Sequence, residues 1–188
     1  MTLSAVIFGF DGTLVDSHEA HFLARREAFG GLGLVLDRPW YDAHAGASLD
    51  EAVALLAAEQ EIRVTVSVQE IDGRCTEAYL RNLDQVRPIS WVVAFAESLK
   101  GHLPIAVASG SSETMIRTTM KAAGIDDLFP VVVTREDVSR GKPSPELFLK
   151  AAERMAVLPT QCLVVDYSNE GVEAAHQAEM PIINVRGK

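Results

Sequence analysis

Short apolar runs recur along the chain between amphipathic stretches, and this alternation restricts the possible folds more than any other feature of the sequence. Each run is apolar on both faces, as expected for a strand buried in a parallel sheet. The runs are AVIFGF (5–10), LPIAVAS (103–109), VVVT (131–134), CLVVD (162–166) and PIINV (181–185). We therefore expect an α/β fold with a doubly wound parallel sheet that binds its ligands at the carboxyl ends of the strands.

Two stretches between the later runs carry the start and stop signals of helices. Residues 111–124 begin with serines that can cap a helix and end in Gly124. Residues 144–156 begin with Ser144 and Pro145, which are favoured at a helix start. Strand and helix therefore alternate through the second half of the chain.

Residues 16–85 interrupt this alternation. Three helical patterns follow one another there without a strand between them, at 16–29, 48–60 and 68–83. The insertion starts directly after the first strand and its loop, and RPISW at 87–91 returns the chain to the sheet. We predict that residues 1–15 and 86–188 form an α/β core and that residues 16–85 form a small helical cap.

Composition and charge narrow the class of protein. The chain has 188 residues, of which 48% are apolar, enough for a sizeable core. The 17 basic and 26 acidic side chains give a net charge of -9, which argues against a nucleic-acid partner. The apolar runs are shorter than a membrane span and lack the basic flank of a signal peptide. Cys75 and Cys162 are far apart in the sequence, so we expect both to be free thiols and the protein to be cytoplasmic. The sequence does not indicate an oligomeric state.

Four motifs in chain order identify a family. They are FGFDGTLVDS (8–17), Ser109 in VASGSS, Lys142 in RGKPSPELF, and VVDYSNEGVEAAHQAEM (164–180). Together they resemble the haloacid dehalogenase (HAD) superfamily, in its branch of small phosphatases and phosphosugar mutases with a helical cap. The resemblance covers nearly the whole chain. It implies a Rossmann-like core, hydrolysis of phosphoric monoesters, a small phosphorylated metabolite as ligand, and Mg²⁺ as cofactor.

The resemblance also assigns roles to residues of the first three motifs. Phosphoryl transfer needs a nucleophile in line, a proton donor for the leaving oxygen, and positive charge over the equatorial oxygens. Gly9 stands where the family carries its nucleophilic aspartate. Asp11 fills the place of the general acid and base, whose backbone carbonyl also binds the metal. Ser109 and Lys142 fill the places of the groups that hold the phosphate.

The fourth motif departs from the family in its metal ligands. The family carries two adjacent acids there, and this chain has Asp166 followed by Tyr167. The resemblance leaves Asp11 and Asp166 as metal ligands, and Mg²⁺ demands near-octahedral oxygen coordination, so we expect a poor magnesium site. Simpler interpretations stay open for both altered positions: Gly9 as a close-packed strand residue and Tyr167 as a surface aromatic.

Contacts to the substrate are assigned by the same resemblance. The residues are Gly110, Ser111, His21 and Ser48. Ser48 belongs to HAGASLDEAV (44–53), which resembles the cap loop of the phosphoglucomutase-like branch, but Leu49 stands where that branch carries an arginine, so we do not expect mutase activity. His18 and His21 are three residues apart on a predicted helix, and no third metal ligand is evident.

Three functions agree with these residues. The first is a HAD-like protein that binds a small phosphorylated metabolite and hydrolyses it weakly or not at all, since losing a nucleophile can lower kcat by roughly 10⁶. The second is a magnesium-dependent phosphosugar or phosphoglycolate-type phosphatase whose natural sequence carries Asp at positions 9 and 167. The third is a non-catalytic interaction protein that uses the cap surface.

Overall fold

The computed structural model describes residues 2–45 and 47–186, and the chain divides into two compact units. The first, here the α/β unit, comprises Met1–Ser17 and Arg87–Lys188, and the second, here the helical unit, comprises His18–Val86. Position 46, which belongs to the predicted loop 44–53, and the last two residues of the predicted core lie outside the described residues.

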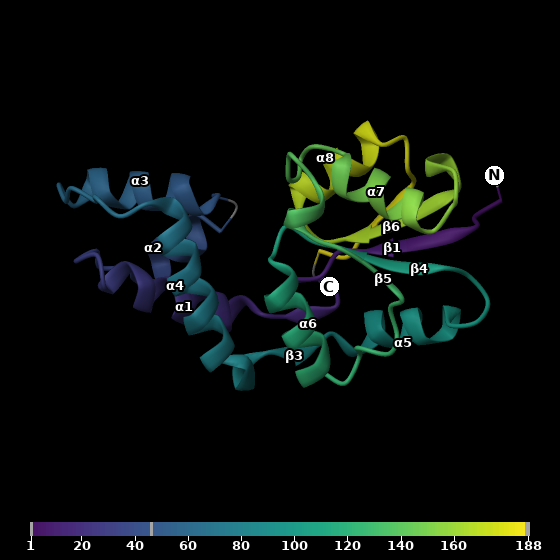
Figure 1. Ribbon diagram of the computed structural model, residues 1–188, viewed down its shortest axis with the longest axis horizontal. Coiled ribbons are helices and arrows are strands. Elements are labelled where there is room, and N and C mark those ends of the chain that lie inside the picture. Colours follow the sequence, from purple (N-terminus) through teal and green to yellow (C-terminus); the bar gives the residue numbers. More distant parts are fainter. Residues whose placement is uncertain (1, 46, 187–188) are drawn as a thin grey trace. The chain divides into compact units, whose positions relative to one another are not determined.

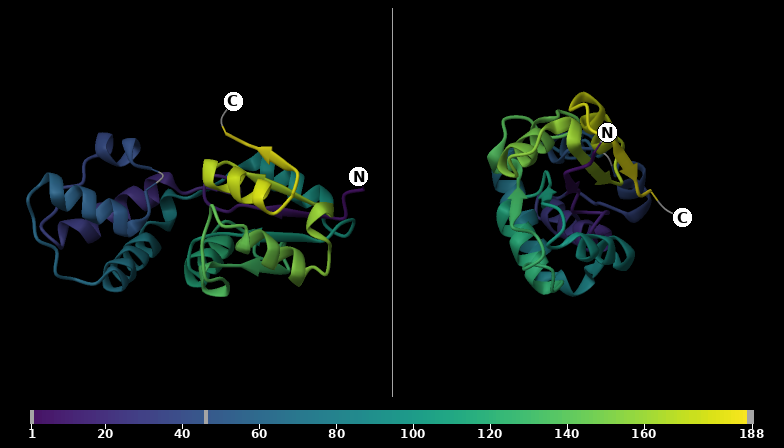
Figure 2. Two further views of the ribbon diagram at one scale, coloured as in Figure 1. Left: turned by 90° about the horizontal axis from the view of Figure 1, so that it is seen from above. Right: turned by 90° about the vertical axis from the view of Figure 1, so that its right-hand side faces the viewer.

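The α/β unit is built on a parallel sheet of five strands in the order β5-β4-β1-β6-β7 (Figure 1). The strands are β1 (Ala5–Phe8), β4 (Ile105–Ala108), β5 (Val131–Val133), β6 (Cys162–Asp166) and β7 (Ile182–Asn184). In the central strand β1, Val6 pairs with Ile105 of β4 and Leu163 of β6. Figure 2 shows β7 as the yellow arrow at one edge of the sheet. All five predicted strands and the α/β class are confirmed, but β7, at the edge of the sheet, is not buried as predicted, and its Ile183 is 44% exposed.

Helices cover both faces of this sheet. They are α5 (Ser90–Leu99), α6 (Glu113–Ala122), α7 (Glu146–Arg154) and α8 (Asn169–Gln177). Figure 1 shows α5 and α6 on one face, and α7 and α8 on the other. Successive side chains of β1 point to opposite faces of the sheet. Ile7 packs in a core cluster with Phe148 of α7. The ring of Phe8 instead contacts the rings of Phe95 of α5 and Phe129 edge-on. Such aromatic pairs add to the stabilisation from burial.

The structure corrects the predicted limits of several elements. A helix beginning at residue 16 is wrong, because β2 (Val15–Asp16) and β3 (Arg87–Pro88) form a two-stranded antiparallel ribbon. The helix starts at His18, and the chain passes from one unit to the other between Ser17 and His18 and between Val86 and Arg87. Strands of two residues are too short to show an alternating pattern, which explains the error.

The helical unit contains α1 (His18–Gly30), α2 (Arg38–Ala43), α3 (Leu49–Glu59) and α4 (Val68–Arg81), drawn in purple to blue in Figures 1 and 2. Three of these helices start at side chains that cap a backbone N–H three residues further on, namely Asp37, Ser48 and Ser67. The unit has its own apolar core, which includes Phe29, Leu56 and Ile71. The sequence pattern did not predict α2, which has only six residues.

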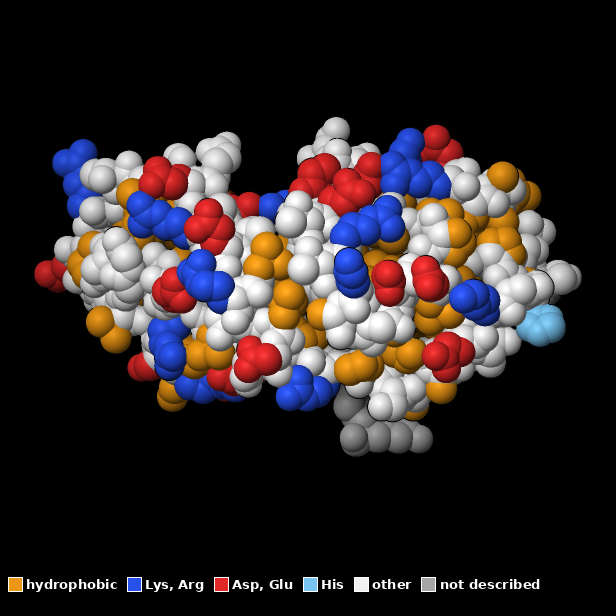
Figure 3. Space-filling view, turned by 60° about the horizontal axis from the view of Figure 1, so that its bottom comes forward, with side chains coloured by type: hydrophobic (Ala, Val, Ile, Leu, Met, Phe, Trp, Pro, Cys, Tyr) orange, Lys and Arg blue, Asp and Glu red, His pale blue; other side chains and the backbone are white. Residues whose placement is uncertain are grey.

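Three short 3₁₀ turns complete the fold: η1 (Leu83–Gln85), η2 (Arg135–Asp137) and η3 (Pro159–Gln161). On the face shown in Figure 3, acidic and basic side chains of the described residues are interspersed, and no extended basic patch is seen. None of the helices in the described ranges has both the length and the apolar character to span a membrane.

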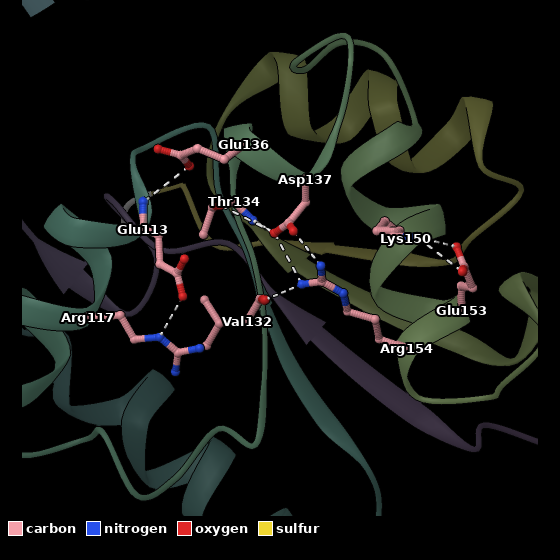
Figure 4. A network of polar contacts seen from close by, with 9 residues as sticks. All are labelled: Glu113, Arg117, Val132, Thr134, Glu136, Asp137, Lys150, Glu153 and Arg154. Atoms are coloured by element: carbon pink, nitrogen blue, oxygen red, sulfur yellow. Dashed lines mark hydrogen bonds and ion pairs between the residues drawn. The ribbon is translucent and has the colours of Figure 1, made fainter.

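A polar network joins β5, η2 and α7 (Figure 4). The guanidinium of Arg154 donates to the carbonyl of Val132 at 2.7 Å and to both carboxylate oxygens of Asp137. The same carboxylate accepts the backbone N–H of Thr134 at 2.8 Å. The network therefore ties β5 and η2 to the last residue of α7, the helix that follows the segment carrying Lys142.

We expect Asp137→Asn to lower the free energy of unfolding by about 1–2 kcal/mol at pH 7, because it weakens a charge-assisted pair. The hydrogen bond from Arg154 lowers the pKa of Asp137 below its ordinary value of 3.8. A carboxyl with a lowered pKa stabilises the fold above its unfolded pKa and loses that effect as the pH falls through its folded pKa. The difference between variant and parent in urea unfolding should therefore shrink below about pH 4.

Glu153→Gln provides the control for this experiment, since the side chain of Glu153 is exposed and, among the described residues, pairs with Lys150 on the same helix. Its effect should stay below about 0.5 kcal/mol. If Asp137→Asn lowered the free energy of unfolding by the same amount at every pH, the negative charge of Asp137 would not be the cause of the stabilisation.

Candidate functional site

The loops that follow β1, β4 and β6 carry most of the predicted site residues of the α/β unit. Gly9 follows β1, Ser109 follows β4, and Asp166 is the last residue of β6. These three strands are neighbours in a parallel sheet, so their carboxyl ends lie at the same edge. Lys142 comes from the segment before α7 and reaches this edge, with its Nζ 2.6 Å from Oδ2 of Asp166.

Lys142 and Asp166 form a largely buried ion pair, with side-chain exposures of 15% and 3%. The ammonium also donates to the carbonyl of Ala108 at 3.3 Å and lies 4.7 Å from the centre of the Phe148 ring. The other carboxylate oxygen of Asp166, Oδ1, accepts the backbone N–H and the hydroxyl of Ser168, both at 2.8 Å. Both oxygens of Asp166 thus already have donors within the protein.

The Asp166 carboxylate occupies the space beside Gly9. A Cβ atom added to Gly9 would lie 2.5 Å from Oδ2 of Asp166, closer than real side chains approach. The same Cβ would lie 3.0 Å from the hydroxyl of Thr13, which is fully buried and has no hydrogen-bond partner among the residues that the structure describes. No side chain fits at position 9 while Asp166 keeps its bond to Lys142.

Asp11 is held by two serine hydroxyls. Ser17 donates to Oδ1 and Ser111 donates to Oδ2, each at 2.7 Å. Ser111 also donates its backbone N–H to the hydroxyl of Ser109 at 3.1 Å. These bonds join the loop after β1 to the loop after β4, whereas Gly110 between the two serines is exposed.

Tyr167 lies against the loop after β1. A Cβ added to Gly12 would be 2.5 to 2.7 Å from three atoms of the Tyr167 ring, and Gly12 has a φ of +70°, which favours glycine. The ring therefore packs on the backbone of Gly12 rather than projecting freely as a surface aromatic. Burial raises the pKa of the Tyr167 phenol, and the nearby charges of Asp11 and Asp166 raise it further.

The other predicted site residues belong to the helical unit. The His21 ring lies 4.6 Å from the ring of Tyr79, measured between centroids. The hydroxyl of Ser48 caps α3 and donates to Asp50 and Glu51, at 2.7 and 2.8 Å, which lowers the pKa of Asp50. A local structural role therefore accounts for Ser48, while substrate contacts by either residue stay a prediction.

Four residues of the site were not singled out from the sequence: Gly12, Thr13, Ser17 and Ser168. All four lie within the first and fourth motifs, where a hydroxyl close in sequence to a carboxylate could have indicated a hydrogen bond. The sequence indicates a missing carboxylate at Tyr167, but not the packing of its ring on Gly12, which is 155 residues away in the chain.

Comparisons with known proteins agree with the four motifs. The family model of haloacid dehalogenase-like hydrolases matches residues 6–185. The chain belongs to this family. It is 32% identical to the fructose-1-phosphate phosphatase YqaB of Escherichia coli over 97% of this chain and 96% of that protein. It is 28% identical to the beta-phosphoglucomutase of Bacillus subtilis over 97% of this chain and 83% of that enzyme.

Solved structures of the HAD-like fold superpose on the chain. The crystal structure of CbbY from Rhodobacter sphaeroides in complex with phosphate gives a TM-score of 0.88 at 23% identity, covering 100% of this chain and 88% of that one. The crystal structure of a hydrolase from Pseudomonas syringae gives a TM-score of 0.82 at 27% identity, covering 96% of this chain and 84% of that one. The predicted HAD-like core is therefore confirmed at the level of the fold.

HAD phosphatases generally use Mg²⁺, and the residues of this site fit that ion poorly. The described residues contain no group of three or more Asp, Glu, His or Cys side chains that could hold a metal. Both oxygens of Asp166 accept hydrogen bonds, Oδ2 from the ammonium of Lys142 and Oδ1 from Ser168. A magnesium ion bound by Asp166 would have to share Oδ2 with the ammonium of Lys142.

A separate hollow of about 440 Å³ lies beside η2 and the start of α7. Its acidic side chains already have partners: Asp137 binds Arg154, Glu146 binds Arg140, and Glu153 binds Lys150. The charges of this hollow are therefore explained by the fold.

Proposed function

We propose that this protein binds a small phosphorylated metabolite, in the manner of a phosphosugar phosphatase, and hydrolyses it weakly or not at all. The observation that carries the proposal is the position of the Asp166 carboxylate beside Gly9. It lies where the side chain of residue 9 would begin, and it is bound to Lys142. The site therefore lacks a carboxylate at position 9 to attack phosphorus, and the nearest carboxylate is engaged.

Binding of a phosphate group remains chemically reasonable at this edge of the sheet. Lys142 uses two of its three ammonium donors within the protein, for Asp166 and the carbonyl of Ala108. We infer that the third donor, the Ser109 hydroxyl and the N–H groups after β4 hold a phosphate without metal. With two carboxylates rather than about four, the site repels a phosphate less than an intact family site does.

A general acid needs a carboxyl group in a fixed position. Asp11 meets this requirement, because two serine hydroxyls hold its carboxylate near the carboxyl ends of the strands. We propose that it can still exchange a proton with a leaving oxygen. Without a nucleophile in line this step leads only to slow attack by water, so turnover stays far below the usual range of about 1–10³ s⁻¹.

Titration calorimetry with inorganic phosphate and fructose 1-phosphate tests the proposal, in EDTA and then in Mg²⁺. We expect binding of both, with dissociation constants that agree within about twofold between the two conditions. Release of phosphate from the ester should be below about 10⁻³ s⁻¹. Binding that requires Mg²⁺, or turnover in the ordinary range of enzymes, would overturn it.

An active phosphatase is the second candidate, and the identity of 32% to a fructose-1-phosphate phosphatase favours it. On this hypothesis the natural protein carries aspartate at positions 9 and 167. Sequencing the source gene decides the matter, since glycine and tyrosine codons there would remove the basis of this candidate.

A further inference from the structure

Tyr167 places an aromatic ring beside the proposed phosphate site. We propose that Tyr167 contacts the organic part of the ligand and makes the site prefer phosphate esters of sugars or polyols over inorganic phosphate. The inference rests on the proposed function, because it needs a phosphate group anchored near Lys142 and Ser109.

The position of the ring supports a binding role. Tyr167 directly follows Asp166, whose carboxylate contacts Lys142, so the ring is at the same edge of the sheet. The ring packs on Gly12 of the loop that also carries Asp11. A side chain at position 12 would collide with it, so the glycine is what permits this packing.

Exposure sets Tyr167 apart from the other two tyrosines of the chain. Its residue exposure is 37%, against 7% for Tyr41 and 1% for Tyr79, both in the helical unit. One part of the ring is thus fixed against the protein, and another part remains open to a ligand. A ring held in this way contacts a ligand at little cost in side-chain entropy.

The chemistry of a tyrosine suits a sugar or polyol. The ring offers an apolar surface to C–H groups, and the phenol, protonated at neutral pH, donates a hydrogen bond to a hydroxyl oxygen. An aspartate at this position would instead add a negative charge close to the phosphate. Replacement of the acid by Tyr167 therefore both lowers repulsion and provides a surface for the carbon skeleton.

Affinity measurements on two variants test the role. Tyr167→Leu should weaken fructose 1-phosphate about tenfold and leave inorganic phosphate within about twofold. Tyr167→Phe, which keeps the ring, should weaken the ester only about threefold. Leu158→Ala, which truncates an exposed side chain at the amino end of β6, is the matched control and should change neither affinity.

Fluorine NMR provides a second test on the parent protein labelled with 3-fluorotyrosine. The only variant it requires is Tyr167→Phe, whose missing signal identifies the resonance of Tyr167. The three tyrosines give three resonances, and we expect that of Tyr167 to shift more with fructose 1-phosphate than with inorganic phosphate. Equal shifts, or an unchanged affinity ratio in Tyr167→Leu, would overturn the inference while leaving the proposed function intact. If neither ligand binds, the proposed function itself fails.

Discussion

Replacing Gly9 and Tyr167 together by aspartate is expected to raise magnesium-dependent hydrolysis of fructose 1-phosphate by on the order of 10⁴-fold. The double change supplies a nucleophilic carboxylate at the end of β1 and a second acid at the end of β6. Both acids are the ones that the resemblance to the HAD family implies at positions where this chain has Gly9 and Tyr167.

The Gly9→Asp change alone should fall far short of this increase. Its Cβ would meet Oδ2 of Asp166 at 2.5 Å, so Asp166 must turn away and release Lys142 before the new carboxylate fits. The acid at position 167 is still missing in the single variant, so the fourth motif offers only Asp166 as a metal ligand. We expect the single variant to be less stable than the parent by about 1–3 kcal/mol.

The matched control for the double variant is Gly9→Asn with Tyr167→Asp. It has nearly the same shape and lacks the nucleophile, so its rate should stay at the level of the parent. Release of phosphate measured with and without Mg²⁺ separates the outcomes. If the double aspartate variant folds, binds the ester and remains as slow as this control, the account of the missing nucleophile is wrong.

Lys142→Met is expected to lower the free energy of unfolding by about 3 kcal/mol, because it leaves the charge of Asp166 buried and unpaired. Asp166 is only 3% exposed at its side chain, and its other oxygen is bound to Ser168, so it cannot turn to water without breaking further bonds. The same change should abolish binding of phosphate, which loses its main positive charge.

A second substitution separates these two effects. In Lys142→Met combined with Asp166→Asn the buried charge is gone, so most of the lost stability should return while phosphate binding stays absent. Urea unfolding and calorimetry report the two quantities independently. A Lys142→Met protein that unfolds within about 0.5 kcal/mol of the parent would show that the pair is not buried in solution.

The sequence predicts those helices and strands that are long enough to show a recognisable hydrophobic pattern. The five strands were found because each is apolar on both faces, and α6 was found because Ser112 caps its start. The ribbon of β2 and β3 was missed because two residues cannot show alternation. In the same way α2, with six residues, is too short for a helical period to be recognised.

The site could be predicted only as a set of residues. The motifs indicated that Gly9, Lys142 and Asp166 belong together, but not that the acid would be bound to the lysine beside the glycine. That arrangement depends on side-chain rotation, on which the sequence pattern gives no information. The packing of Tyr167 on Gly12 likewise required the three-dimensional structure.

The crowding between position 9 and Asp166 has a consequence for how the site could change over time. A larger residue at position 9 and the present orientation of Asp166 exclude one another. A substitution at position 9 is therefore tolerated only if the Asp166 side chain takes another orientation. A mutation that introduces an acid at position 9 therefore begins at a disadvantage, and it requires a coordinated change at Asp166 rather than a single codon.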